Sequence, residues 1–291
     1  MTQHTDVFET PPNMLASYAR ALVMRRKPWR EGQTVPHLEA TLAPRRPHPG
    51  HVRHFRRVAE LPDVPELPVT YPQLMAAPLH LHLLTHPDFP FAPMGIVHVR
   101  NVIEQFMPLS TEHALGIKCF LEGHRDVPLG VELDLVTEVR TGGQLAWRGV
   151  TTMLRRGKQK AEGAKPRYEQ PPELQVDRTA LFTVSEGTGR RHAAVSGDVN
   201  PIHIAAWTAK LFGFPRAIAH GMWSLSRCMG LLAGDLPPPP LRVEVAFKRP
   251  VLLPSEVEFA VRREGDVRRF WLRSADGKTV HLEGEARPIS R

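Results

Sequence analysis

Two segments of the chain have the apolar residues expected of helices buried in a protein core. From about Tyr71 to His86 apolar side chains occur almost all round the predicted helix, and a second such helix is predicted from Met222 to Ala233. An amphipathic helix is predicted over residues 13–26, with Asn13 as its cap and Lys27-Pro28 as its stop. The pattern therefore predicts one core helix in each half of the chain.

Runs of predicted strands follow each core helix. They cover residues 96–106, 114–121, 131–139 and 145–154 in the first half, and residues 242–248, 256–263, 268–274 and 279–287 in the second. Val243, Val245 and Phe247 alternate with polar residues, which is typical of a sheet with one buried face. Hairpins are predicted at Gly142-Gly143 and at Gly265-Asp266. Each half is thus predicted to be a buried helix wrapped by an antiparallel meander.

Two other stretches have little to bury. Residues 31–69 are rich in proline and charge and are predicted to be mostly irregular. Between Arg155 and Pro172 the sequence is basic and polar, which indicates an exposed linker between two domains. The predicted domains cover residues 1–160 and 170–291.

A group of proton-transfer residues lies in the second half, within Val-Ser-Gly-Asp-Val-Asn-Pro-Ile-His at residues 195–203. Gly197 and Asn200-Pro201 break regular structure, so Asp198 and His203 are expected on a held loop. A carboxylate beside an imidazole is the minimal pair for moving protons near neutral pH. The alternative is that Ser196 or Asp198 only caps a helix beginning near Ile204.

The composition limits which cellular locations and which cysteine-based sites are expected. The 291 residues are 42% hydrophobic, enough for a sizeable core, and include only two cysteines, Cys119 and Cys228, both in apolar runs. No disulfide framework or cysteine metal site is therefore expected, and a reducing, cytoplasmic location is predicted. No leader segment and no run of about 18 apolar residues is visible, so membrane insertion is not indicated.

The formal charge of +8 indicates an anionic partner or substrate. The clearest basic cluster, at residues 45–57, is predicted to be a solvated or phosphate-facing loop, and it has no helical face or zinc spacing typical of nucleic-acid binding. His80, His82 and His86 have the spacing of metal ligands, but no acidic or cysteine partner stands at ligand spacing. Packed, hydrogen-bonded histidines are the favoured interpretation, with no metal site.

The segment Ser196-Gly197-Asp198-Val199-Asn200-Pro201-Ile202-His203, followed by Ala219-His220-Gly221-Met222, resembles the signature of the MaoC-like dehydratases, also called (R)-specific enoyl-CoA hydratases or hydratase 2. The resemblance runs from about Leu181 to the C-terminus and departs at His192, where relatives carry an aromatic residue. It implies an α+β double hotdog fold, a pseudo-dimer within one chain that leaves a homodimer of chains open. The first half then resembles a degenerate hotdog domain, catalytically silent and lining an acyl tunnel.

The resemblance also implies roles for residues. Asp198 and His203 match the catalytic pair that activates water and exchanges the C2 proton of a trans-2-enoyl thioester. The backbone N–H of Gly221 matches the oxyanion donor, and Ser196 and Asn200 orient the loop or the substrate. The substrate would be a thioester of CoA or of acyl carrier protein, without a cofactor.

Less specific predictions concern four other side chains of the second half. His220 is expected to be structural rather than a proton carrier. Trp207, Trp223 and Met229 are expected in the core or the acyl tunnel.

Two rival functions are open on the sequence. A non-catalytic subunit that binds acyl thioesters would keep the fold without turnover, and the intact Asp198 and His203 argue against it. A hotdog thioesterase would place a carboxylate on a central helix, and neither residues 71–86 nor residues 222–233 offer a suitable one.

Overall fold

The computed structural model describes residues 4–23, 29, 32–93, 95–157 and 175–289. Its strands are β1 (His4–Phe8), β2 (Leu38–Arg45), β3 (Ile96–Gln105), β4 (Leu115–Val127), β5 (Gly130–Thr141), β6 (Gln144–Arg156), β7 (Arg178–Val184), β8 (Leu241–Phe247), β9 (Ser255–Glu264), β10 (Val267–Ser274) and β11 (Val280–Pro288). Its helices are α1 (Met14–Val23), α2 (Pro49–Ala59), α3 (Tyr71–Leu84), α4 (Thr188–Ser196), α5 (Pro201–Ile204), α6 (Ala206–Lys210) and α7 (Gly221–Leu231).

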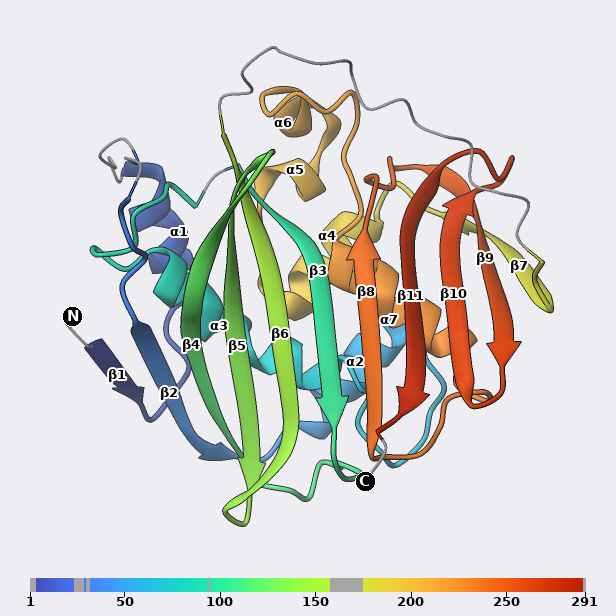
Figure 1. Cartoon of the computed structure of the whole chain (residues 1–291), viewed down its shortest axis with the longest axis horizontal. Helices are drawn as coiled ribbons and strands as arrows, with labels where there is room; N and C mark the ends of the chain where they lie inside the picture. The colour runs from blue at the N-terminus through green and yellow to red at the C-terminus, as the bar shows by residue number, and fades with distance from the viewer. Residues whose placement is uncertain (1–3, 24–28, 30–31, 94, 158–174, 290–291) are drawn as a thin grey trace.

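All described strands join in one curved sheet with helices gathered on its inner side (Figure 1). The strand order is β1-β2-β4-β5-β6-β3-β8-β11-β10-β9-β7, and every pairing is antiparallel except that of β1 with β2. The two halves meet where β3 pairs with β8, with Asn101 opposite Val245. Across this junction Arg242 donates a hydrogen bond of 2.6 Å to Glu104. The halves therefore share one hydrogen-bonded sheet.

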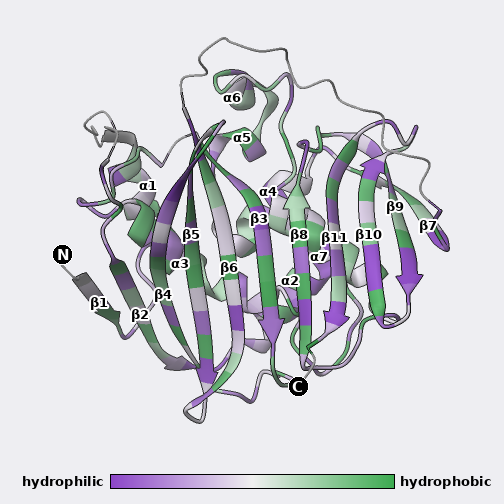
Figure 2. Cartoon of the chain, viewed as in Figure 1, coloured by the Kyte–Doolittle hydropathy of each residue, from purple (hydrophilic) through white to green (hydrophobic). Residues whose placement is uncertain are grey.

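The alternation of the strands explains which face is buried. In β8 the odd-numbered residues Leu241, Val243 and Val245 are at most 4% exposed, whereas their polar neighbours face outward. Figure 2 shows the same alternation as hydrophobic and hydrophilic bands along the strands. The predicted hairpin at Gly142-Gly143 is confirmed, since both glycines have positive φ between β5 and β6.

The two predicted core helices are confirmed as α3 and α7, and neither contains an exposed residue. Two tryptophans bind neighbouring segments through their ring N–H groups. Trp147 in β6 donates to the carbonyl of Val69, just before α3, at 2.9 Å, and Trp223 in α7 donates to that of Val58 in α2 at 2.9 Å. The hydroxyls of Thr70 and Ser226 lie 2.8 Å apart and link the start of α3 to α7. The core helices of the two halves are thus directly connected.

The prediction that residues 31–69 are mostly irregular is wrong, since they contain β2 and α2. Val52, Phe55 and Val58 form the buried face of α2, so part of the basic cluster is helical rather than a solvated loop. Arg56 is only 5% exposed, and its guanidinium donates to the carbonyls of Pro62, Val64 and Glu66. Its charge therefore stabilises the loop before α3 and does not face a phosphate.

Several smaller predictions are also decided. Trp223 and Met229 are buried, whereas Trp207 on α6 is 71% exposed, so of its two predicted positions, core or acyl tunnel, the core is wrong. Cys119 and Cys228 are free and buried. The predicted linker lies mainly at residues 158–174, outside the described residues, and β6 extends through Arg156. Among the described helices, none has the length and apolar character needed to cross a membrane.

Candidate active site

The loop that bears Asp198 is held at both ends. At its start Gly197 caps α4 with φ of 73°, and its N–H donates to the Ala193 carbonyl at 2.8 Å. At its end Asn200 caps α5, since its side chain accepts from the Ile202 N–H at 3.4 Å and Pro201 opens the helix. Asn200 is therefore the helix cap, rather than Ser196 or Asp198.

Ser196 holds the loop from the inside. Its hydroxyl donates to the His192 carbonyl at 2.9 Å and accepts from the Asp198 N–H at 3.1 Å. These bonds fit the predicted role of Ser196 in orienting the loop.

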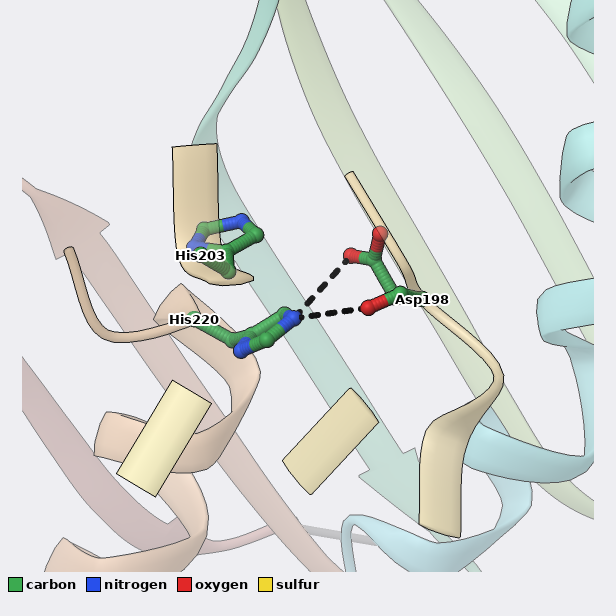
Figure 3. Close-up of side chains that lie close together, drawn as sticks. All are labelled: Asp198, His203 and His220. Atoms are coloured by element: carbon green, nitrogen blue, oxygen red, sulfur yellow. Dashed lines mark hydrogen bonds and ion pairs between the residues drawn. The ribbon is translucent and has the colours of Figure 1, made fainter. Parts of the chain in front are cut away.

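The two carboxylate oxygens of Asp198 have different surroundings. Oδ1 accepts from the Tyr18 hydroxyl at 2.7 Å and from the Asn200 N–H at 3.1 Å. Oδ2 lies 3.7 Å from Nε2 of His220, and the Asp198 side chain as a whole is 41% exposed, so water can reach the carboxylate. Figure 3 shows the carboxylate turned toward the two histidines.

The pKa of Asp198 is set by opposing effects. Burial disfavours the charged form, but the nearby His220 and His203 and the hydrogen bond from Tyr18 outweigh it and lower the pKa to about 2. Asp198 is therefore an acceptor at neutral pH.

His203 has a tautomer fixed by its neighbour. Its Nδ1 lies 2.8 Å from the carbonyl of Ile218, and a carbonyl can only accept, so Nδ1 carries the hydrogen. In the neutral ring Nε2 then has a free lone pair. Burial lowers the pKa of His203 below its ordinary value of 6.5, although Asp198 opposes this shift. The ring is therefore neutral and basic at Nε2 near pH 7.

His220 packs on the other side of the pair. Its ring stacks on that of His203, and its Nε2 donates to the backbone carbonyl of Asp198 at 3.1 Å. The ring of His192 follows, with its centroid 4.7 Å from that of His220. Burial lowers the pKa of His220 well below 6.5 and the pKa of His192 to about 4, so both rings are neutral near pH 7.

Gly221, the next residue, is the first of α7. The first N–H groups of a helix lack partners within it, and the helix dipole adds positive potential there. A Cβ at Gly221 would lie 3.1 Å from the ring of Phe247, so only glycine fits without displacing that ring. The structure thus places an N–H donor one residue from His220, which itself contacts Asp198.

Asp198, His203 and His220 are also the group of described residues that could hold a metal ion, with one ligand atom of each within 4.8 Å of the others. A hydrogen bond of His220 competes with metal binding. Nε2 of His220 carries a hydrogen that it donates to a carbonyl, so it would have to lose this bond to bind a metal.

Two histidines of the predicted cluster, His80 and His82 on α3, are packed and hydrogen-bonded as expected. Nε2 of His80 lies 2.6 Å from the Thr137 hydroxyl, and Nε2 of His82 lies 2.7 Å from Asp6, a partner on β1 that the sequence spacing did not indicate.

The structure brings together all five residues predicted for the site and adds Tyr18, which lies 180 positions before Asp198 in the chain. No local motif marks Tyr18, so its contact could not be found from spacing. The closeness of His220 had a signal, because it precedes Gly221 within the quoted motif.

The chain is similar to proteins of a known family. Residues 159–284 match the model of the MaoC like domain family. The chain is 39% identical over 201 residues to 3-hydroxyacyl-thioester dehydratase X of Mycobacterium tuberculosis, covering 69% of this chain and 71% of that protein. It is 32% identical over 152 residues to the peroxisomal enoyl-CoA hydratase 2 of Arabidopsis thaliana, covering 48% and 49%.

A solved structure extends the similarity to the first half. The crystal structure of HtdX of Mycobacterium tuberculosis superposes with a TM-score of 0.75 at 33% identity, covering 86% of this chain and all of that chain. The predicted double hotdog fold is confirmed by this likeness. The chain therefore belongs to the family of MaoC-like dehydratases.

Proposed function

We propose that this chain is a hydro-lyase that reversibly hydrates trans-2-enoyl thioesters to (R)-3-hydroxyacyl thioesters. The observation that carries the proposal is an ionised Asp198 beside a neutral His203 whose Nε2 is unprotonated, next to the helix N-terminus at Gly221. The names of the relatives, a 3-hydroxyacyl-thioester dehydratase and an enoyl-CoA hydratase 2, support the reaction class.

In the hydration direction, Nε2 of His203 accepts one proton from water while Oδ2 of Asp198 orients the same water through its other hydrogen. The water oxygen bonds to C3, and the electrons of the double bond move toward the thioester carbonyl. The Gly221 N–H stabilises the charge that develops on this oxygen. The imidazolium of His203 then returns its proton to C2, which restores the neutral base.

Asp198 has a second part in this cycle. Its negative charge raises the pKa of His203 against the effect of burial, so it stabilises the imidazolium formed midway. An ionised Asp198 and a neutral His203 thus have complementary roles.

The carrier of the acyl group is CoA or acyl carrier protein, both anionic and both compatible with the charge of +8. We further propose that residues 1–160 form a unit without its own catalytic pair that lines the acyl tunnel, and that residues 170–291 form the catalytic unit. A reducing, cytoplasmic location is proposed from the two free, buried thiols of Cys119 and Cys228.

Hydrolysis of the thioester is the alternative reaction on this fold. Neither α3 nor α7 contains an aspartate or glutamate, so the central helices lack the carboxylate that a hotdog thioesterase would use. The proposed hydration needs only the groups of the described site.

The test is an assay of the purified chain with a short trans-2-enoyl group carried on CoA or on acyl carrier protein. We expect loss of the enoyl thioester and formation of the (R)-3-hydroxy product, resolved by chiral chromatography. Asp198→Asn and His203→Ala should each lower kcat about 10²-fold to 10⁴-fold, as for loss of a general acid or base.

Asp266→Asn, in an exposed hairpin turn, is the matched control and should keep the activity. Circular dichroism and thermal unfolding should show that all variants remain folded. Full turnover by the Asp198→Asn, His203→Ala double variant would refute the assignment. Release of free CoA from a saturated acyl-CoA, without hydration, would instead indicate a thioesterase.

A further inference from the structure

The helix α1, in the first half of the chain, lies directly on the loop that bears Asp198. The Tyr18 hydroxyl donates to Oδ1 of Asp198 at 2.7 Å. One turn earlier on the same helix face, the Met14 thioether lies against Gly197, where a Cβ would come within 2.5 Å of the sulfur. Two residues of α1 thus contact two consecutive residues of the loop.

This helix is anchored by burial of the same side. Ser17 is 1% exposed and Ala21 is 7% exposed, while Leu15 on the other side is 70% exposed. The position of Tyr18 is therefore set by packing of α1 against the protein rather than by its hydrogen bond alone.

The hydrogen bond from Tyr18 gives the two carboxylate oxygens of Asp198 different partners. Oδ1 accepts from both Tyr18 and the Asn200 N–H, and two donors occupy the two lone pairs of one carboxylate oxygen. Oδ2 is left toward His220, 3.7 Å away, on the side of the histidine pair. Oδ2 is therefore the oxygen that can hold water.

The phenol of Tyr18 is also a permanent donor. Burial and the negative charge of Asp198 raise the pKa of Tyr18 well above its ordinary value of 10. Near neutral pH Tyr18 therefore presents an O–H to Asp198 and favours the ionised carboxylate.

We propose that Tyr18 is a positioning residue of the active site, which holds Oδ1 of Asp198 so that Oδ2 alone faces the reacting water. The proposal rests on the proposed hydratase function. It means that the first half of the chain, expected from the sequence to be catalytically silent, supplies a side chain to the site. Tyr18 itself does not touch the reacting atoms and acts only through Asp198.

The kinetic test compares Tyr18→Phe with Tyr71→Phe. Tyr71 is also a tyrosine of the first half. It is buried, and its hydroxyl pairs with His51 at 2.8 Å instead of with Asp198. Tyr18→Phe should lower kcat about 10-fold to 100-fold, the kinetic equivalent of one hydrogen bond to a charged group, with KM nearly unchanged. Tyr71→Phe should lower kcat far less.

A double-variant cycle shows whether Tyr18 acts through Asp198. In the Asp198→Asn background, which keeps the size of the side chain but removes its charge, Tyr18→Phe should cause no further loss of kcat. Equal losses in both backgrounds, or no loss in either, would overturn the proposal.

NMR can detect the contact between Tyr18 and Asp198 without any enzymatic turnover. The chain has three tyrosines, so labelling with ¹³C at Cζ gives three resonances, assigned with the two phenylalanine variants. Asp198→Asn should shift the resonance of Tyr18 and leave that of Tyr71 in place; an unchanged Tyr18 resonance would overturn the contact. If the wild type hydrates no enoyl thioester, the proposed function fails, whereas this signal still decides whether Tyr18 donates to Asp198.

Discussion

The imidazole of His203 stacks on that of His220, with ring centroids 3.7 Å apart and planes 24° from parallel. Two cations in such contact would repel each other, and His203 indeed lowers the pKa of His220 in addition to burial. Burial keeps His220 neutral near pH 7, although its Nε2 hydrogen bond to the Asp198 carbonyl raises its pKa, and the ring of His203 packs against it. The proposed proton acceptor of the pair is Nε2 of His203, whose Nδ1 carries the hydrogen bonded to Ile218.

The first prediction concerns the pH dependence of hydration. A general base works in its neutral form, so kcat/KM should rise as His203 loses its proton. Because burial lowers the pKa of His203 below 6.5, activity should persist to a lower pH than an ordinary imidazole would allow. The measurement is kcat/KM against pH on a short enoyl thioester. An acid limb with an apparent pKa at or above 6.5 would contradict the assignment of His203 as the base.

The second prediction concerns stability against pH. Burial lowers the pKa of His80 to about 3 and that of His192 to about 4. Below pH 6.5 the unfolded chain therefore binds protons that the folded chain excludes, so stability present at pH 7 is lost as the pH falls. Each histidine should contribute a loss of about 2 kcal/mol between pH 7 and pH 5.

Urea unfolding at the two pH values measures this loss. In His80→Gln, whose amide can still bond to Thr137, the difference in unfolding free energy between pH 7 and pH 5 should be smaller by about that amount. An unchanged difference would show that His80 is protonated in the folded protein.

The third prediction concerns Gly221. Alanine is compatible with its place in the first turn of α7, but the new Cβ would lie 3.1 Å from the ring of Phe247. Since the ring or the helix start must shift, Gly221→Ala should lower kcat by about 10-fold to 10³-fold, as when an oxyanion donor is displaced, with little loss of stability. Adding Phe247→Leu gives the Cβ room, and recovery of kcat in this double variant is the expected result. Full kcat in Gly221→Ala would contradict the prediction that crowding by Phe247 displaces the N–H of Gly221.

The fourth prediction concerns Gly197, which has φ of 73° and faces the sulfur of Met14. Gly197→Ala should lower the free energy of unfolding by about 1–2 kcal/mol from the backbone strain, with a further loss from the collision. Gly265→Ala is the matched control, because its φ is 58° but no atom lies within 4 Å of the added Cβ. Met14→Ala should recover part of the loss only in the Gly197 variant. Equal losses in thermal or urea unfolding for both glycine variants would mean that α1 does not press on the loop.

The sequence predicted what depends on local patterns. Strand alternation as in Val243, Val245 and Phe247, the apolar segment at residues 71–84, and the motif from Ser196 to His203 each have a cause within a few residues. The two core helices and the loop that bears Asp198 and His203 could therefore be predicted from these patterns.

The errors arose where distant contacts decide. The buried residues Val52, Phe55, Val58 and Ala59 of α2 do have helical spacing, but the many arginines and histidines between them hid it. Trp207 is large and apolar, yet it lies on α6, a helix of five residues, and is 71% exposed. The bond from Tyr18 to Asp198 depends on how two halves of the chain pack, which no local rule contains.

The pairing of β3 with β8 has a consequence for any attempt to use the second half by itself. Within the whole chain β8 has neighbours on both sides, β3 and β11. A fragment beginning after the first half would expose the backbone N–H and C=O groups of β8 as a bare sheet edge, which is a template for aggregation. The second half therefore carries the loop with Asp198 and His203 but needs β3 of the first half to cover the edge of its sheet.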